Sequence, residues 1–219
     1  MMNVENLQDK LNRNAVHRKK EINFLSFTIQ SFDGDIKKAQ LRSAFLILYA
    51  HYEGFSKEAV RLFLKFLNQQ SIKVSELNLN LQSVYYTKRF IDINHSKYKR
   101  DYHHFLEHFI RNDEVFNLDI NSKGIVVTDS NLKYDLLEDL LFMIGIDPKT
   151  FIFKQNQSLE LKRTLIENVI LDNRNKIAHG ENISINYESF IDVKNFVIEY
   201  IDILSDKIIE IAMDKKYLS

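Results

Sequence analysis

The 219-residue sequence contains no cysteine, one proline and five glycines. The absence of cysteine excludes a disulfide framework, a thiol nucleophile and a zinc site built from thiolates. Because proline and glycine interrupt helices, their scarcity favours long, continuous helices. No apolar run reaches the roughly 18 residues that a membrane-spanning helix requires, and the sequence starts without an apolar signal core. We therefore expect a cytoplasmic all-α protein with no membrane contact.

An excess of charge of either sign is also missing. Thirty basic and thirty acidic residues give a formal net charge of zero. A protein that coats nucleic acid without specificity needs a large positive field, so the charge balance argues against that class while allowing a local basic groove. Hydrophobic residues make up 45% of the chain, which is enough for the core of one domain over residues 1–219.

Apolar residues recur at steps of three and four over several long stretches, which is the period of a bundle helix. The pattern predicts long helices over about residues 6–31, 36–68, 158–179 and 187–215. The second of these is apolar on almost every side between positions 44 and 50, so we expect it in the centre of a bundle or against a second chain. The predicted fold is an antiparallel helical bundle.

Residues 70–157 follow a less regular pattern, and we interpret them as an insertion that decorates the bundle. Within them, Val115–Leu118 and Gly124–Thr128 flank polar residues and predict a small β-hairpin. Ser130 and Asn131 precede an apolar helical pattern and are expected to cap that helix at its N-terminus.

The segment Arg174-Asn175-Lys176-Ile177-Ala178-His179-Gly180-Glu181 carries the strongest chemical signal. Arginine can grip a phosphate with a planar fork of donors, and histidine can carry protons near neutral pH. On a helix, Asn175 and His179 share a face, whereas Arg174 points away and must reach round. The alternative is that both charged side chains only complement the helix dipole at its C-terminal end.

Cleavage of RNA through its own 2′-hydroxyl needs a base for that hydroxyl and an acid for the leaving 5′-oxygen. One copy of the segment supplies one histidine. A symmetric homodimer would place two copies across a two-fold axis and supply both groups.

Three blocks of the sequence resemble the HEPN superfamily of helical ribonucleases. Residues 171–181 closely resemble its RN-x-x-A-H-G signature. Residues 48–55 are similar to the Y-A-H-W-E-G-F helix of one prokaryotic subgroup, with Tyr52 in place of the usual tryptophan. Residues 130–133, followed by a helix and the Ile-Gly-Ile-Asp of residues 144–147, also fit that subgroup.

The resemblance implies a bundle of four or five helices that dimerises, with the motif in a cleft at the interface. It also implies metal-independent RNA cleavage that leaves a 2′,3′-cyclic phosphate and uses no cofactor. Many such proteins are toxins or antiviral effectors, so a cognate antitoxin or defence-system partner is implied; others are catalytically silent and bind RNA or a partner. On this chain His179 would be the acid or base, Arg174 would hold the scissile phosphate, and Asn175 would orient the phosphate or the histidine.

Other side chains are candidates for supporting roles. Glu53 could pair with Arg174 and position it, or simply face solvent. His51 lies two residues away and points about 200° from Glu53, so both cannot face one cleft, and a packed core or interface histidine is favoured at that position. Lys176, together with two cations in the insertion, is expected to contact RNA phosphates. Those two cations are Lys97 and Arg100.

A rival pattern lies in the insertion. His104, Glu107 and His108 match the H-x-x-E-H pattern of inverted zinc peptidases, with His103 beside them. The two histidines four residues apart could share a zinc ion on one helix face. That pattern needs a third ligand from elsewhere, and no candidate stands out. We therefore predict no metal and expect solvated histidines or contacts with RNA phosphates.

Overall fold

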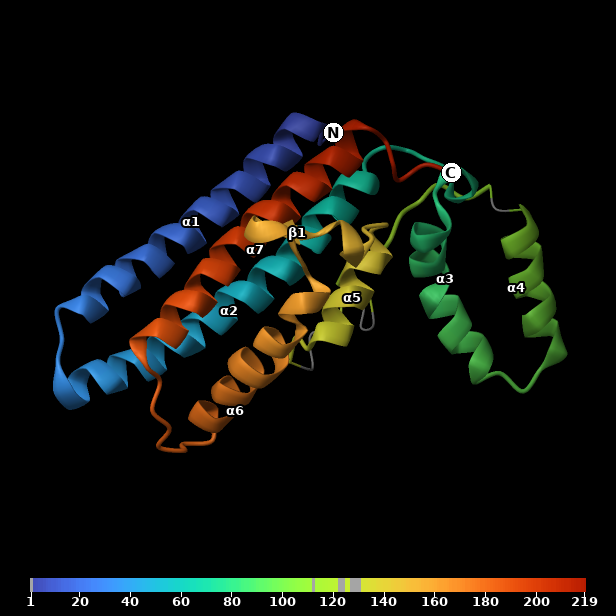
Figure 1. Cartoon of the computed structure of the whole chain (residues 1–219). Coiled ribbons are helices and arrows are strands. Elements are labelled where there is room, and N and C mark those ends of the chain that lie inside the picture. Colours follow the sequence, from blue (N-terminus) through green and yellow to red (C-terminus); the bar gives the residue numbers. More distant parts are fainter. Residues whose placement is uncertain (1, 112, 122–124, 127–130) are drawn as a thin grey trace.

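The computed structural model describes residues 2–111, 113–121, 125–126 and 131–219. Three long helices form a bundle (Figure 1): α1 (Val4–Gln30), α2 (Gly34–Leu67) and α7 (Tyr187–Met213). Helix α1 runs antiparallel to the other two, which run in the same direction because the segments between them return the chain to its starting end. The predicted all-α fold is confirmed, and no described helix is both long and apolar enough to cross a bilayer.

The ends of the first two helices follow from local chemistry. The Asn3 side chain accepts a hydrogen bond from the Asn6 backbone N–H, and the Asn6 side chain accepts one from the Asn3 backbone, which together form a capping box. Helix α1 is capped at its C-terminal end by Ser31. Gly34 then adopts a φ of +59°, which favours glycine, at the first residue of α2.

Helix α2 lies in the centre of the bundle, which is one of the two positions that the sequence predicts for it. It packs against α1 and α7 along its length and also contacts α5 and α6. Its side chains Phe45, Leu48, Tyr52 and Phe55 are fully buried. The Tyr52 ring packs edge-on against Tyr200 of α7, at 5.2 Å between centroids. Within the stretch at positions 44–50, Leu46 and Ile47 are half-buried and Ala50 is exposed, so contact with a second chain stays a prediction.

The hydroxyl groups of these two tyrosines differ in their hydrogen bonding. Tyr200 Oη lies 2.8 Å from Ser56 Oγ, while the buried Tyr52 hydroxyl has no hydrogen-bond partner among the described residues. Because a buried unsatisfied hydroxyl costs about 1–3 kcal/mol, Tyr52→Phe should leave the free energy of unfolding unchanged or raise it by about 1 kcal/mol. Tyr200→Phe, the matched control, should lower it by about 1 kcal/mol. Urea unfolding would measure both, and equal losses in the two variants would contradict the assignment.

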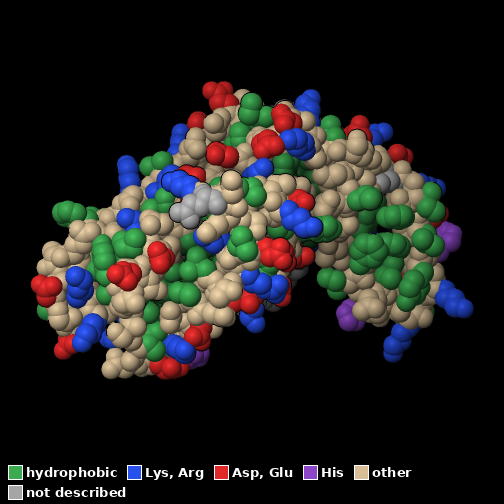
Figure 2. Space-filling view, viewed as in Figure 1, with side chains coloured by type: hydrophobic (Ala, Val, Ile, Leu, Met, Phe, Trp, Pro, Cys, Tyr) green, Lys and Arg blue, Asp and Glu red, His purple; other side chains and the backbone are tan. Residues whose placement is uncertain are grey.

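Residues between α2 and the motif form three further helices: α3 (Leu79–Asn94), α4 (Lys99–Arg111) and α5 (Tyr134–Met143). Helix α5 packs on α2 and α3, whereas α4 packs on α3 and contains no buried residue. We call α3 and α4 the arm, because they project from the bundle (Figure 1). Hydrophobic side chains gather on its surface (Figure 2). Exposed large hydrophobic residues of α3 and α4 include Phe90, Leu106 and Phe109.

The small sheet is elsewhere than predicted. Strands β1 (Ile152–Phe153) and β2 (Gln157–Ser158) pair antiparallel, and Phe153 stacks on Phe196 of α7. Val115, in the first predicted strand, instead forms an isolated bridge with Lys73. The second predicted strand, residues 124–128, lies mostly outside the described residues. Strands of two residues are too short to show a period-two pattern, which is why the sequence did not indicate them. Short 3₁₀ turns complete the connections, at Val74–Glu76, Pro148–Thr150, Lys154–Asn156 and Glu160–Lys162.

Candidate functional site at the end of α6

The helical segment that leads to the motif is not a uniform α-helix, in contrast to the prediction. Residues Leu165–Leu171 form a π-helix, and α6 (Asp172–Ala178) continues from it. The Asp172 N–H accordingly donates to the carbonyl of Glu167, five residues earlier. Ile166 and Ile170 of the π-helix are buried, whereas Leu161, in the preceding 3₁₀ turn, is 70% exposed.

Gly180 ends α6, directly after residue 179, where the sequence predicts that the helix stops. The Gly180 N–H donates to the Ile177 carbonyl at 3.0 Å, and the Glu181 N–H donates to the Lys176 carbonyl at 2.9 Å. These two bonds form a Schellman motif, for which Gly180 adopts a φ of +80°. The His179 N–H still bonds to the Asn175 carbonyl, at 3.0 Å. Asn175 and His179 therefore lie one turn apart, and the His179 side chain is exposed at the helix end.

Asn175 is held in a defined orientation. Its side-chain oxygen accepts hydrogen bonds from Arg174 Nη1 at 3.0 Å and from Asn131 Nδ2 at 2.9 Å. Because arginine has only donors, the Asn175 atom that faces it must be the oxygen. The amide N–H₂ of Asn175 makes no hydrogen bond with other described residues, so it remains available to donate to a bound group.

Arg174 keeps its positive charge available. Its guanidinium lies over the Tyr49 ring, 5.2 Å from the centroid, and forms no ion pair with a carboxylate in the described part of the chain. Arg163 shows the contrast, because it is paired with Asp135 at 2.6 Å and lies 3.5 Å from Glu167. A half-buried guanidinium supported by a ring and lacking an anion is well suited to bind one.

Tyr49 connects this arginine to the rest of the bundle. Its hydroxyl accepts a hydrogen bond from the Leu132 N–H at 2.9 Å. Burial raises the pKa of the Tyr49 hydroxyl, and its hydrogen bond to the Glu53 carboxylate raises it further, so the group stays protonated. Glu53 pairs with Lys57 at 2.5 Å. Of the two alternatives for Glu53, the ion pair with Arg174 is not formed, and Tyr49 lies between the carboxylate and the arginine.

His51 lies on another side of α2, against α1. It is buried, with Nδ1 3.3 Å from Arg18 Nη1 and Nε2 3.2 Å from Glu21 Oε2, the latter without hydrogen-bond geometry. Burial lowers the pKa of His51. Gly54 makes this arrangement possible, because a Cβ there would lie 2.9 Å from Arg18 Nη1. The structure therefore separates His51 from Glu53 and from the motif.

The three cations predicted to bind RNA have different locations. Lys176 lies in α6 and pairs with Asp172 at 2.7 Å, an exposed contact that a phosphate could displace. Lys97 and Arg100 lie at the tip of the arm, far from α6 (Figure 1). Arg100 there stacks over Tyr98 at 4.9 Å. Within one chain, only Lys176 is close to the motif.

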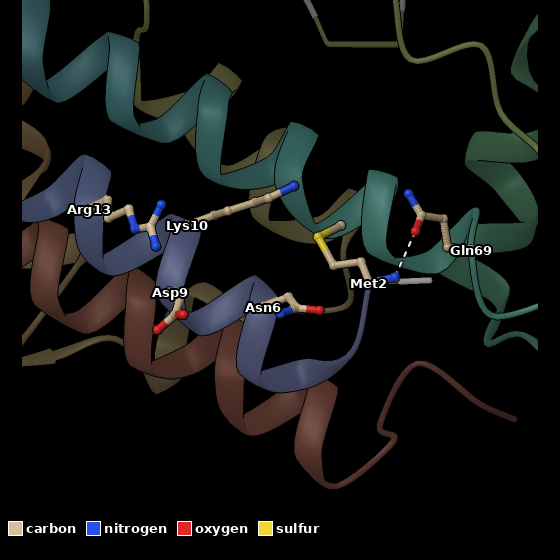
Figure 3. Close-up of a pocket in the computed structure, with 6 residues that line it drawn as sticks. All are labelled: Met2, Asn6, Asp9, Lys10, Arg13 and Gln69. Carbon is tan, nitrogen blue, oxygen red and sulfur yellow. Dashed lines mark hydrogen bonds between the residues drawn. The ribbon is translucent and has the colours of Figure 1, made fainter.

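A groove of about 590 Å³ runs beside Asn175. It is lined by polar and charged side chains from the start of α5, the π-helix and α6, including Asn131, Lys133, Arg163 and Asn168. Another hollow, of about 360 Å³, lies at the start of α1 (Figure 3). There the Met2 N–H donates to the Gln69 side chain, and no motif residue contributes.

Two members of the site were missed by the sequence analysis. Asn131 was expected to cap α5, but α5 begins at Tyr134, and the Asn131 side chain instead holds Asn175. Tyr49 was recognised only as part of a resemblance and not as the support of Arg174. Both residues lie in the blocks that resembled HEPN proteins, so their contacts with Arg174 and Asn175 connect all three blocks in space.

Comparison with protein families agrees with this arrangement. Residues 7–217 match the MAE_28990-like HEPN family. The chain belongs to the HEPN superfamily. No match was found among curated proteins or solved structures. The family match runs through the bundle, the arm and the motif, so these parts of the HEPN chain are described by a single family.

Proposed function

We propose that this HEPN protein is a metal-independent endoribonuclease with its active site at the end of α6. The observation that carries the proposal is the contact between an arginine that lacks a carboxylate partner among the described residues and an asparagine whose side-chain oxygen already accepts two hydrogen bonds. Arg174 would hold the scissile phosphate and stabilise its developing negative charge. Asn175 would donate its free amide hydrogens to the same phosphate.

His179 would move the protons of the reaction. Attack of the 2′-hydroxyl on phosphorus breaks the bond to the 5′-oxygen, leaves a 2′,3′-cyclic phosphate, and requires one proton to be removed and one to be supplied. The exposed position of His179 allows it to meet substrate, but one chain provides one such histidine. We therefore propose that two chains meet at this end of the bundle and form a composite site, as a homodimer that acts as a toxin or antiviral effector.

A second candidate is a catalytically silent module that binds RNA or a partner protein. It is favoured by one observation: the His179 side chain has no hydrogen-bond partner among the described residues, although a catalytic histidine is usually oriented by a second group. In the composite site, the second chain would have to supply that group.

Purified protein incubated with single-stranded RNA and a chelator separates the two candidates. The ribonuclease should produce discrete fragments whose rate of formation is unchanged by the chelator and whose 3′ ends carry cyclic phosphates, identified by mass spectrometry. An RNA whose 2′-hydroxyls are replaced by hydrogen should resist cleavage. Binding of RNA without fragments would support the silent module, and fragments that require a divalent metal would overturn the proposed chemistry.

A further inference from the structure

Three ligand-type side chains converge on the exposed face of α4. Glu107 Oε2 lies 3.4 Å from His104 Nδ1 and 3.6 Å from His103 Nδ1. One ligand atom from each residue lies within 4.8 Å of the other two. The arm therefore brings two imidazole nitrogens and one carboxylate oxygen together on a single turn of helix, well away from the motif in α6 (Figure 1).

The spacing of these atoms suits a tetrahedral metal ion. Zinc binds histidine nitrogen and carboxylate oxygen at about 2.0–2.2 Å, so neighbouring ligand atoms of a tetrahedron lie about 3.3–3.6 Å apart. The two separations measured from Glu107 Oε2 fall close to that range. Two histidines and one glutamate also form a ligand set that leaves the fourth position open.

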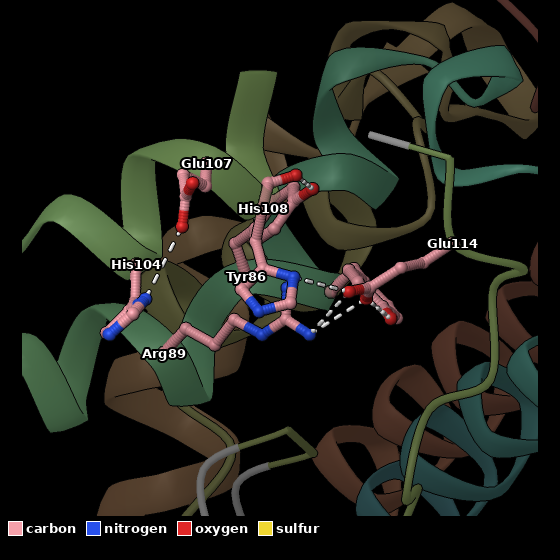
Figure 4. Close-up of polar contacts among 7 residues, drawn as sticks. Tyr86, Arg89, His104, Glu107, His108 and Glu114 are labelled. Atoms are coloured by element: carbon pink, nitrogen blue, oxygen red, sulfur yellow. Dashed lines mark hydrogen bonds and ion pairs between the residues drawn. The ribbon is translucent and has the colours of Figure 1, made fainter. Parts of the chain in front are cut away.

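His108 does not belong to this group, in contrast to the H-x-x-E-H pattern. Figure 4 shows His104 and Glu107 pointing toward one another, while His108 turns toward Glu114. His108 Nδ1 lies 2.8 Å from Glu114 Oε1. Glu114 is itself held by Arg89 at 2.8 Å and by the Tyr85 hydroxyl at 2.6 Å. The network around Glu114 therefore turns His108 aside, and no ligand atom of His108 belongs to the group within 4.8 Å.

We propose that His103, His104 and Glu107 bind one zinc-type divalent ion, with its fourth position open to an exogenous ligand. The open position follows from exposure, because all three side chains are solvent-accessible and no further ligand group of the described residues approaches them. His104 also lines a hollow of about 300 Å³ between α3 and α4, which offers space for a group bound to the ion. The site is independent of the proposed RNA cleavage, which uses other residues and no metal.

The test uses the full-length chain without a polyhistidine tag, stripped of metal by a chelator. Titration with zinc chloride against a chromophoric indicator should show one equivalent bound, and cobalt(II) should give the intense visible absorption of a tetrahedral site. His104→Ala and Glu107→Gln should each weaken binding by more than about tenfold, since even outer-shell changes cost about 10–100-fold.

His108→Ala is the matched control, because it removes a histidine of the same helix that the structure assigns to Glu114. It should bind zinc as the wild type does. Equal weakening in His108→Ala and His104→Ala would overturn the proposed ligand set in favour of the pair four residues apart. Failure of the wild type to bind zinc would overturn the site altogether. Neither result bears on chelator-resistant RNA cleavage.

Discussion

Replacing His179 by alanine should lower the rate of RNA cleavage by about 10²–10⁴-fold, the usual contribution of a general acid or base. Its side chain is exposed and makes no hydrogen bond within the described structure, so the free energy of unfolding should stay within about 0.5 kcal/mol of the wild type. Initial rates on a labelled single-stranded RNA, together with urea unfolding, would measure both quantities. Cleavage by His179→Ala at the wild-type rate would show that the proposed function is wrong.

Lys176 offers the matched control for this experiment. It lies between Arg174 and His179 in sequence, and it transfers no proton in the proposed reaction. Lys176→Ala should therefore weaken RNA binding at most, and at saturating RNA it should lower the rate far less than His179→Ala does. A comparable loss in both variants would indicate that the segment binds RNA through its total charge, without a specific role for His179.

His179→Ala also tests whether two chains share one site. In an equal mixture of wild-type and His179→Ala chains that exchange freely, a site needing both histidines retains about one quarter of the wild-type activity, whereas independent sites retain about one half. Activity well below one half of the wild-type value would therefore indicate a composite site, because a monomeric enzyme would retain one half.

Replacing Tyr49 by alanine should have the second large effect, on both stability and activity. The ring is buried and supports the Arg174 guanidinium, and its hydroxyl satisfies the Leu132 N–H. Removal of a buried aromatic side chain costs about 3–5 kcal/mol of unfolding free energy. Loss of a cation–π contact worth about 0.5–2 kcal/mol should also slow cleavage by roughly 2–30-fold in the fraction that stays folded.

Tyr49→Phe separates these contributions. It keeps the ring beneath Arg174 and removes the acceptor of the Leu132 N–H, so it should cost about 1–3 kcal/mol in stability and leave the cleavage rate of the folded protein nearly unchanged. Urea unfolding and RNA cleavage at a temperature where both variants are folded would test this. If Tyr49→Phe slows cleavage as much as Tyr49→Ala, the hydroxyl and its bond to Glu53 position the arginine, and the ring does not.

The sequence predicted the all-α class, three of the four long helices and the HEPN family correctly, because these depend on local signals. Steps of three and four defined the apolar faces of α1, α2 and α7, and Gly180 defined the end of α6. The roles of Arg174, Asn175 and His179 stay predictions, although the structure brings the first two into direct contact.

The sequence could not reveal contacts between residues that are distant along the chain. Asn131 lies 44 positions from Asn175, and nothing local distinguishes an asparagine that caps its own helix from one that binds another. One of the two alternatives for Glu53, an ion pair with Arg174, is not formed for a related reason. Lys57, one turn along the same helix, is a nearer partner for the carboxylate.

The direction of the site depends on the π-helix that precedes the motif. Its hydrogen bonds span five residues, so Leu165–Leu171 accommodates more chain per turn than an α-helix would. Ile166 and Ile170 anchor this stretch in the core, while Arg174 and Asn175 follow it directly. If these same seven residues wound as a plain α-helix, the motif would turn by about 100° and point away from Tyr49 and Asn131. The wide turn therefore sets the direction in which Arg174 points.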